Sequence, residues 1–170
     1  LLERGHEATV FDNFSRGHRD ATSTARIIQG DLLDPDPIRD ALRCGGFDVV
    51  MHFAALCHVG ESVERPLQYY RNNVGGTLNL LEAMIGIGPG KLVFSSTCAT
   101  YGNPIEVPMS EGHPQAPINP YGATKLMVER MLQDFPGADG LDSVSLRYFN
   151  AAGSEPQGRI GERHDPETHL

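Results

Sequence analysis

Short strand-like segments alternate along this chain with segments of helical periodicity, and this alternation limits the folds that the chain can adopt. Helical patterns lie between the strand-like segments, the longest at 67–85, where apolar residues recur every three or four positions. The strand-like segments are rich in residues that favour strands and cover 8–11, 26–29, 48–53, 91–94 and 143–149. Segment 48–53 is nearly all apolar, as is typical of a strand covered by helices on both faces. The sequence therefore predicts an α/β fold with a doubly wound parallel sheet.

The strand expected at the centre of such a sheet is missing from the sequence. Residues 1–6 resemble the last turn of a helix that ends at a glycine cap, so segment 8–11 would be the second strand of the fold. In the strand order 3-2-1-4-5-6 the first strand is central. We therefore expect two half-sheets without a strand between them. We also expect the chain to be an internal piece of a longer protein, truncated at both ends.

A tyrosine and a lysine, Tyr121 and Lys125, stand four positions apart at the start of a helical segment. Four residues is a little over one helical turn, so both side chains project from the same face. A phenol is a poor base at neutral pH because its pKa is about 10, and a nearby ammonium favours the phenolate. The pair is therefore a candidate for proton transfer. The alternative is an ordinary surface helix with an exposed lysine and a half-buried tyrosine.

A cluster of hydroxyl side chains, Ser95, Ser96 and Thr97, follows the predicted strand 91–94. In open α/β sheets ligands bind beyond the carboxyl ends of the strands, so a hydroxyl at this place faces the site. Thr97 is the candidate that would join the tyrosine and the lysine there. The alternative is that the three hydroxyls satisfy nearby backbone groups.

Asp12 ends the first predicted strand, and an acid at a strand end suits the paired hydroxyls of an adenosine ribose. In a dinucleotide-binding unit this acid follows a glycine fingerprint by about 20 residues, so the fingerprint would lie upstream of residue 1. The same acid would repel the extra phosphate of NADP. Two alternatives stay open: Asp12 opens a turn, or Arg16 and Arg19 accept a 2′-phosphate.

Charge and cysteine content exclude several partners. The chain has 14 basic and 22 acidic residues, a net charge of −8, so neither nucleic acid nor an anionic membrane is an expected partner. No apolar run approaches the ~20 residues that cross a membrane. Cys44, Cys57 and Cys98 are widely spaced and indicate the reduced thiols of a cytoplasmic protein, and no feature beside Cys98 would activate it as a nucleophile. The seven histidines lack metal-ligand spacing, so no metal site is expected.

Several short motifs occur in the order and spacing of one enzyme family. They are found at 10–13, 30–32, 52–55, 59–62, 70–77, 95–97, 121–125 and 146–150. By these motifs the chain resembles the extended short-chain dehydrogenase/reductases and, within that group, the 4-epimerases that act on UDP-glucose and UDP-galactose. The resemblance implies a Rossmann-like NAD-binding domain over 1–150, without its first strand and glycine-rich loop, and the start of a substrate-binding domain over 151–170. It also implies a homodimer formed through helices that flank the sheet.

The resemblance further implies tightly held NAD that is reduced and reoxidised within one turnover, so that one stereocentre inverts through a 4-keto sugar. Tyr121 would take the proton from the sugar 4-hydroxyl, Lys125 would hold the nicotinamide ribose and lower the tyrosine pKa, and Thr97 would hydrogen-bond the reacting hydroxyl. The other implied positions are Asp12 and Asn13 at the adenosine ribose, Asp31 and Leu32 at the adenine, Phe53, Ala54, Ala55 and Asn72 along the middle of the cofactor, Tyr148 and Phe149 by the nicotinamide, and Asn150 and His169 at the substrate.

Other functions on the same scaffold stay open. A dTDP-glucose 4,6-dehydratase has Asp-Glu directly after the threonine, whereas this chain has Cys98 and an alanine there. A UDP-arabinose 4-epimerase would differ in a pocket that lies mostly beyond residue 170. A non-catalytic nucleotide-binding protein can dispense with the tyrosine or the lysine, and both are present. Two positions depart from the family: Cys57 replaces a lysine that some epimerases have near the cofactor, and His169 replaces a frequent asparagine. We expect the 170 residues alone to be inactive.

Overall fold

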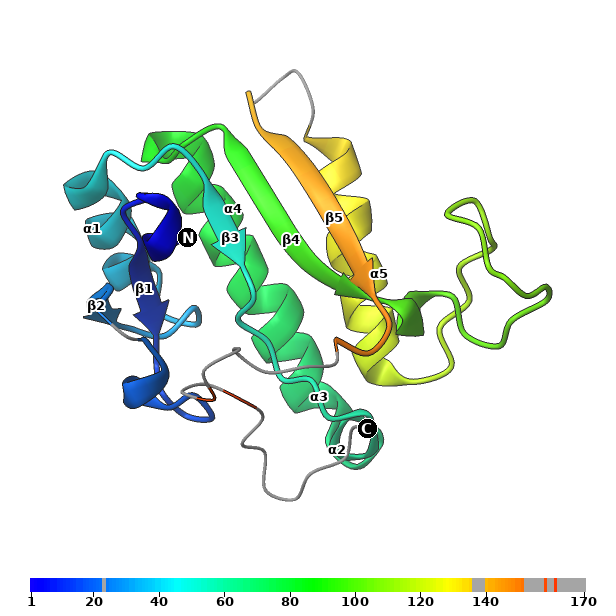
Figure 1. The fold of residues 1–170 in the computed structure, drawn as a ribbon. Coiled ribbons are helices and arrows are strands. Elements are labelled where there is room, and N and C mark those ends of the chain that lie inside the picture. Colours follow the sequence, from blue (N-terminus) through cyan, green and yellow to red (C-terminus); the bar gives the residue numbers. More distant parts are fainter. Residues whose placement is uncertain (23, 136–139, 152–157, 159–160, 162–170) are drawn as a thin grey trace.

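The structure, a computed structural model, describes residues 1–22, 24–135, 140–151, 158 and 161, and it contains two parallel sheets. The first sheet pairs β1 with β2, and the second has the strand order β3-β4-β5 (Figure 1). The strands are β1 (Thr9–Asp12), β2 (Arg26–Gln29), β3 (Val50–His52), β4 (Lys91–Thr97) and β5 (Asp142–Tyr148). All three pairings are parallel, with helices between the strands, so the predicted α/β class is confirmed.

The two sheets lie beside each other without a shared strand pairing. In the described part of the chain, the remaining edge of β1 and the remaining edge of β3 pair with no strand. β1 and β2 precede β3 in the chain, as the second and third strands do in the order 3-2-1-4-5-6. The prediction of two half-sheets without a central strand between them is therefore confirmed for the described residues.

Capping residues set both ends of the first helix. The Asp34 side chain accepts a hydrogen bond from the Asp36 backbone N–H at 3.3 Å, and Pro35 occupies the first helical position. Gly46, with φ of 58°, follows the helix as its left-handed cap. The helices are α1 (Pro35–Gly45), α2 (Val59–Glu64), α3 (Pro66–Tyr69), α4 (Gly76–Ile87) and α5 (Pro120–Asp134), with short 3-10 turns at η1 (Leu2–Arg4), η2 (Arg19–Thr22) and η4 (Cys98–Thr100).

Two helical features were not expected. Helix α2 forms although Gly60 and Ser62 are residue types that favour loops. The expected helix over 67–85 is interrupted by a π-helical segment, η3 (Tyr70–Gly75), between α3 and α4. π-helical turns are rare and often lie at functional sites.

The core lies between the three-stranded sheet and helices α1, α4 and α5. Its most deeply buried members, each at most 2% exposed, are Ile38, Leu81, Leu92, Phe94 and Val128. In Figure 1, α4 and α5 cover one face of the sheet. The opposite face exposes apolar side chains such as Met51, which is 41% exposed. The expected cover on both faces of strand 48–53 is thus not found, because no described helix lies over this second face.

Helix α5 buries most of the side that its apolar residues predict. The apolar residues Leu126, Met127, Met131, Leu132 and Phe135 predict the buried side; Leu132 is buried and Met131 and Phe135 pack against the core, but Met127 is 46% exposed. Val128, Lys125 and Glu129 are buried as well. The two charged side chains are buried because polar groups on the sheet meet them, as described below. Among the described residues, no helix is long and apolar enough to cross a membrane.

Candidate active site

Three consecutive residues at the end of β4 face different partners. The Ser95 carbonyl accepts a hydrogen bond from the Lys125 ammonium at 2.8 Å. The Ser96 hydroxyl donates to the buried Glu129 carboxylate. The Thr97 hydroxyl oxygen accepts from the Ala99 backbone N–H at 3.1 Å and so caps η4. Each of the three residues thus has a different partner, and Thr97 lies at the carboxyl edge of the sheet.

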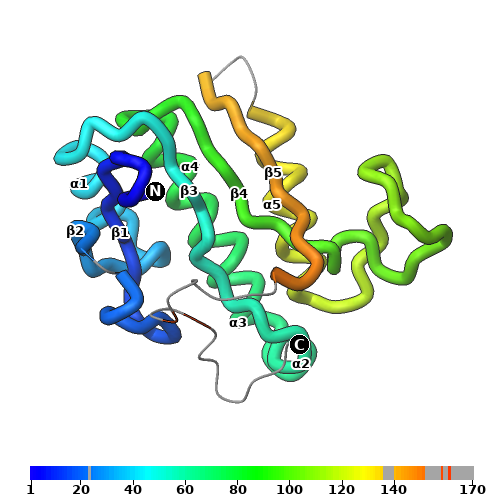
Figure 2. The backbone as a smooth tube through the Cα atoms, viewed as in Figure 1, coloured from blue at the N-terminus to red at the C-terminus, as the bar shows by residue number. Residues whose placement is uncertain are grey.

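The first turn of α5 packs tightly on η4. The Asn119 side chain accepts from the Gly122 backbone N–H at 2.8 Å and caps the helix, and Pro120 follows at its first position. A Cβ at Gly122 would lie only 2.5 Å from the Ala99 carbonyl oxygen. Only glycine allows this close approach, and it brings Tyr121, the preceding residue, beside Thr97. Figure 2 shows the long loop 102–119 running outward between η4 and α5.

The structure brings Tyr121, Lys125 and Thr97 together at the end of β4. The Thr97 side chain lies within reach of the Tyr121 phenol and lowers its pKa. The Lys125 Nζ lies 5.9 Å from the centre of the Tyr121 ring and 4.9 Å from the centre of the Phe94 ring. The three groups therefore lie close enough to act on one small substrate group.

Burial dominates the protonation of this cluster. It raises the pKa of the Tyr121 phenol, with Cys57 and Cys98 acting in the same direction and the hydrogen bond from Thr97 opposing them. It lowers the pKa of Lys125 to about 8, with Cys57 opposing. The expected lowering of the tyrosine pKa by the lysine is not found. The reason is that the ammonium bonds to the Ser95 carbonyl and lies over the ring, while burial disfavours the phenolate.

The residues predicted for the adenosine end meet where β1 and β2 finish. Asp12 accepts a hydrogen bond from the Phe14 backbone N–H at 2.6 Å, as expected if Asp12 opens a turn. The Asn13 side chain donates to Asp31 at 2.9 Å, and Asp31 also accepts from the Leu33 backbone N–H at 2.8 Å. Two carboxylates from neighbouring strands therefore lie at one edge, and Leu32 packs against the core beside them.

Both arginines near Asp12 have other partners. Arg16 forms an ion pair with Glu61 at 2.8 Å. Arg19 donates to Gln29, and its guanidinium lies 4.3 Å from the centre of the Phe14 ring. Neither contact is made with Asp12.

The loop after β3 is held by an asparagine that the sequence reasoning missed. Asn73, in the π-helical segment, accepts from the Leu56 backbone N–H at 2.9 Å and donates to the Leu56 carbonyl at 3.0 Å. It also contacts the Thr124 hydroxyl of α5 at 3.2 Å. The predicted cofactor residue Asn72 donates to Asn73 at 3.0 Å. The π-helical turn thus ties the loop to α5, and the signal in the sequence was a second asparagine beside the predicted one.

The remaining predicted residues lie at the same carboxyl edge. Phe53 is 57% exposed and Phe149 is 60% exposed; Ala54 and Asn150 are also exposed, and Ala55 is half-buried. Tyr148 pairs in register with Thr97 across β4 and β5, so the two residues are neighbours on adjacent strands. His169 and most of 151–170 lie outside the described residues.

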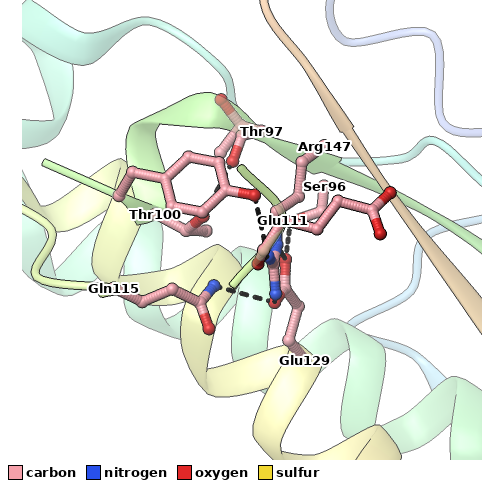
Figure 3. A network of polar contacts seen from close by, with 8 residues as sticks. Ser96, Thr97, Thr100, Glu111, Gln115, Glu129 and Arg147 are labelled. Carbon is pink, nitrogen blue, oxygen red and sulfur yellow. Dashed lines mark hydrogen bonds and ion pairs between the residues drawn. The ribbon is translucent and has the colours of Figure 1, made fainter. Parts of the chain in front are cut away.

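A second polar cluster was also missed by the sequence reasoning. Figure 3 shows Glu129 of α5 receiving hydrogen bonds from Arg147 of β5 and Gln115 of the loop. An arginine within a predicted strand, and a glutamate four residues after Lys125 on the same helical face, are the signals that could have revealed it. Among the described residues, no group of three or more His, Cys, Asp and Glu side chains could hold a metal ion.

Comparison with protein families gives one match over almost the whole chain. The sequence model of the NAD dependent epimerase/dehydratase family matches residues 1–167. The UDP-glucose 4-epimerase of Halalkalibacterium halodurans is 49% identical over 170 residues, which are 100% of this chain and 51% of that protein. The UDP-glucose 4-epimerase of Rhizobium meliloti is 50% identical over 169 residues, or 99% of this chain and 52% of that protein.

Solved structures of similar proteins agree closely with the fold. The UDP-glucose 4-epimerase of Brucella ovis in complex with NAD is 49% identical, with a TM-score of 0.96 over 99% of this chain and 52% of that one. An epimerase of Stenotrophomonas maltophila, with bound NAD and formylated UDP-arabinopyranose, is 35% identical, with a TM-score of 0.92 over 100% of this chain and 54% of that one. The chain thus spans about half the length of the relatives that it matches.

Proposed function

Because this chain belongs to the NAD dependent epimerase/dehydratase family, we propose that the full-length protein interconverts UDP-glucose and UDP-galactose by inverting carbon 4, a step of galactose metabolism. The observation that carries the proposal is the meeting of Tyr121, Lys125 and Thr97 at the carboxyl end of β4. A phenol, an ammonium and a hydroxyl at one point suit proton transfer at a carbinol beside a hydride acceptor. Relatives named UDP-glucose 4-epimerase at about half identity support the choice of sugar.

The donor and acceptor groups at the edge of β1 and β2 fit NAD. When bound, NAD would take the hydride from carbon 4 and return it to the other face of a transient 4-keto sugar. The Asp12 carboxylate and the Asn13 amide would hold the adenosine ribose, and Asp31 with Leu32 would lie at the adenine. The nearby Arg16 and Arg19 are engaged by Glu61, Gln29 and Phe14, so this edge offers a carboxylate to a free ribose diol.

The middle and the nicotinamide end of the cofactor would be held by the loops after β3 and β5. The small residues Ala54 and Ala55 allow a ligand to approach the backbone, with Phe53 and Asn72 beside them. Lys125 has three N–H donors and donates one hydrogen bond to the Ser95 carbonyl, so it can also bind ribose hydroxyls. Tyr148 and Phe149 would flank the nicotinamide.

Tyr121 would move the proton of the reacting hydroxyl. In this proposal the phenolate accepts the proton from the sugar 4-hydroxyl as the hydride leaves, and it returns the proton when the hydride comes back. Thr97 would hydrogen-bond the same hydroxyl and fix its direction. Burial raises the pKa of Tyr121, whereas Thr97 lowers it. Thr97 therefore favours the phenolate. Asn150 and His169 would contact the substrate.

Two other nucleotide-sugar reactions can be weighed against this one. Dehydration needs an acid and a base beside the threonine, and Cys98 with Ala99 supplies no carboxylate there. A pentose substrate has a specific observation in its favour, since the Stenotrophomonas maltophila structure holds a formylated UDP-arabinopyranose. UDP-arabinose is therefore the second candidate substrate, and a panel of UDP-sugars separates the two.

We also propose a cytoplasmic homodimer. Cys44, Cys57 and Cys98 form no disulfide, as suits a reducing compartment. The helices that flank the sheet expose apolar side chains, among them Leu78, Ile85 and Met127, which a second copy could cover.

The test is a Tyr121→Phe variant of the full-length protein. We expect UDP-galactose to UDP-glucose turnover to fall by about 10²–10⁴-fold, the usual contribution of a positioned acid or base, while NAD stays bound. Tyr70→Phe makes the same chemical change on the π-helical segment and should keep its activity. Unchanged turnover in Tyr121→Phe would remove the tyrosine from the mechanism.

A further inference from the structure

A buried carboxylate on α5, that of Glu129, joins three other parts of the molecule. Its side chain is 2% exposed, and its oxygens accept hydrogen bonds from β4, from β5 and from the loop 102–119 (Figure 3). The donors are the Ser96 hydroxyl, the Arg147 guanidinium and, at 3.0 Å, the Gln115 amide. One side chain therefore connects the helix that carries the candidate base to the sheet and to the loop beside the site.

The contact with Arg147 is directional. The Arg147 Nε donates to Glu129 Oε1 at 3.0 Å, and its Nη2 donates to Oε2 at 2.7 Å. Such two-point pairs fix orientation as well as distance. The other terminal nitrogen, Nη1, donates to the Tyr101 hydroxyl at 2.9 Å and to the Glu111 carbonyl at 3.2 Å, so the same guanidinium holds the loop.

The carboxylate stays charged although it is buried. Burial raises the pKa of Glu129. Hydrogen bonds from Arg147, Ser96 and Gln115 together lower it by more, so the net pKa lies below its usual value. The ion pair is therefore maintained at neutral pH.

The pair acts on the candidate site through two rigid elements. Ser96 directly precedes Thr97 on β4 and lies opposite Arg147 in the β4–β5 register. Glu129 follows Tyr121 by eight residues, about 12 Å along the helix axis at 1.5 Å per residue. The other end of α5 rests on η4 through Gly122. The helix is thus held at two points, by Glu129 on Ser96 of β4 and by Gly122 on η4.

We infer that Glu129 and Arg147 are positioning residues: they hold α5 against β4 so that the Tyr121 phenol stays within reach of Thr97. The inference rests on the proposed function, because it states what the pair does for that reaction. A misplacement of about 1 Å in an active site can lower the rate about 10²-fold. The competing explanation is a pair that stabilises the fold and has no effect on the site.

The protonation of Tyr121 separates the two explanations. The titratable groups that face the phenol are Lys125 of the same helix, Cys57 of the loop after β3 and Cys98 of η4. None of these groups changes when the pair is removed, but the hydrogen bond from Thr97 depends on the position of α5. Losing that hydrogen bond raises the phenol pKa, and the acid limb of the kcat profile then moves to higher pH.

The experiment uses Glu129→Gln in the full-length protein with its cofactor. We expect kcat to fall about 10- to 100-fold, KM for the UDP-sugar to change little, and the acid limb to move to higher pH. Asp134→Asn is the matched control, because it removes an exposed ion pair with Arg130 on the same helix. It should leave kcat and the pH profile unchanged.

Ser96→Ala decides the question if Glu129→Gln does not fold, since it removes a single hydroxyl from the carboxylate. It should shift the acid limb in the same direction with a smaller loss of kcat. A variant that melts earlier yet keeps the wild-type kcat and pH profile overturns the inference, because the pair would then only stabilise the fold.

A titration without substrate keeps this inference separate from the proposed function. Ultraviolet absorbance of each protein, minus that of the same protein carrying Tyr121→Phe, follows the ionisation of this one phenol. We expect a higher phenol pKa in Glu129→Gln than in wild type, and an equal pKa would overturn the positioning role. A wild-type protein that converts no UDP-sugar would refute the proposed function, while this titration would still decide the role of the pair.

Discussion

The buried ammonium of Lys125 should make the folded protein more stable as the pH rises above neutrality. Burial lowers its pKa to about 8 from the value of 10.5 for an exposed lysine. Between these two values the unfolded chain binds more protons than the folded chain, so a rising pH favours folding throughout that window. The gain begins near the folded-state pKa and is complete above the unfolded-state pKa.

The size of the effect follows from the two pKa values. Each pH unit between them contributes up to about 1.4 kcal/mol, so protonated Lys125 lowers the free energy of unfolding by about 3 kcal/mol at neutral pH. Between about pH 7.5 and pH 9.5 the lysine alone should add about 2 kcal/mol to the free energy of unfolding. Methionine has a similar unbranched chain without the charge, so Lys125→Met should lack this gain.

The assay is urea unfolding of the full-length protein without cofactor, at both pH values, for wild type and Lys125→Met. The difference between the two proteins cancels the tyrosines and other groups that titrate in the same range. Lys91→Met is the control, since Lys91 is exposed at the other end of β4 and should behave as wild type. Parallel pH dependences for wild type and Lys125→Met would refute the reasoning, because they would mean that the ammonium carries no burial cost.

Two further substitutions test how the site is built. Gly122→Ala puts a Cβ 2.5 Å from the Ala99 carbonyl oxygen, so we expect a loss of about 1–3 kcal/mol in the free energy of unfolding and a lower kcat. The control is Gly86→Ala, whose Cβ meets nothing within 4 Å and which should be neutral or stabilising in thermal melts. Asn73→Ala leaves the Leu56 backbone groups without their partner, so it should lower the free energy of unfolding by about 2 kcal/mol. It should also speed NAD release in a cofactor-retention assay. Wild-type retention would show that Asn73 does not support the loop after β3.

The strands and two of the helix starts could be predicted from local sequence because their causes are local. Segment 26–29 matches β2 at both ends, since a short run of β-branched residues ends there at a glycine. The starts of α1 and α5 follow from Asp34 and Asn119, whose side chains cap the helices as short polar residues do. Helix α2 was missed because Gly60 and Ser62 are typical of loops, and only its packing against α5 and α3 makes the segment helical.

The site could be predicted in part, because its members combine a local pattern with a global one. The spacing of Tyr121 and Lys125 is local, and the place of Thr97 at a strand end follows from parallel topology. The buried side of α5 was predicted correctly for Leu132, Met131 and Phe135 but not for Met127, because apolar periodicity favoured Met127 over Glu129. What buries Glu129 is Arg147, 18 residues later, and a partner at that distance leaves no trace in the pattern of the helix itself.

Lys125 and Glu129 lie one turn apart on the same buried face, yet the structure compensates them unequally. Glu129 has donors from three elements, and its pKa lies below the usual value, so its charge is favoured where it lies. Lys125 has the Ser95 carbonyl and the faces of two rings, and its pKa lies below the usual value of an ammonium, so its charge is disfavoured. A buried ammonium whose N–H donors lack partners destabilises the fold unless a ligand completes its hydrogen bonds. Lys125, which would meet the cofactor, therefore lowers the stability of the fold. Glu129, one turn later, stabilises the fold and holds the helix in place.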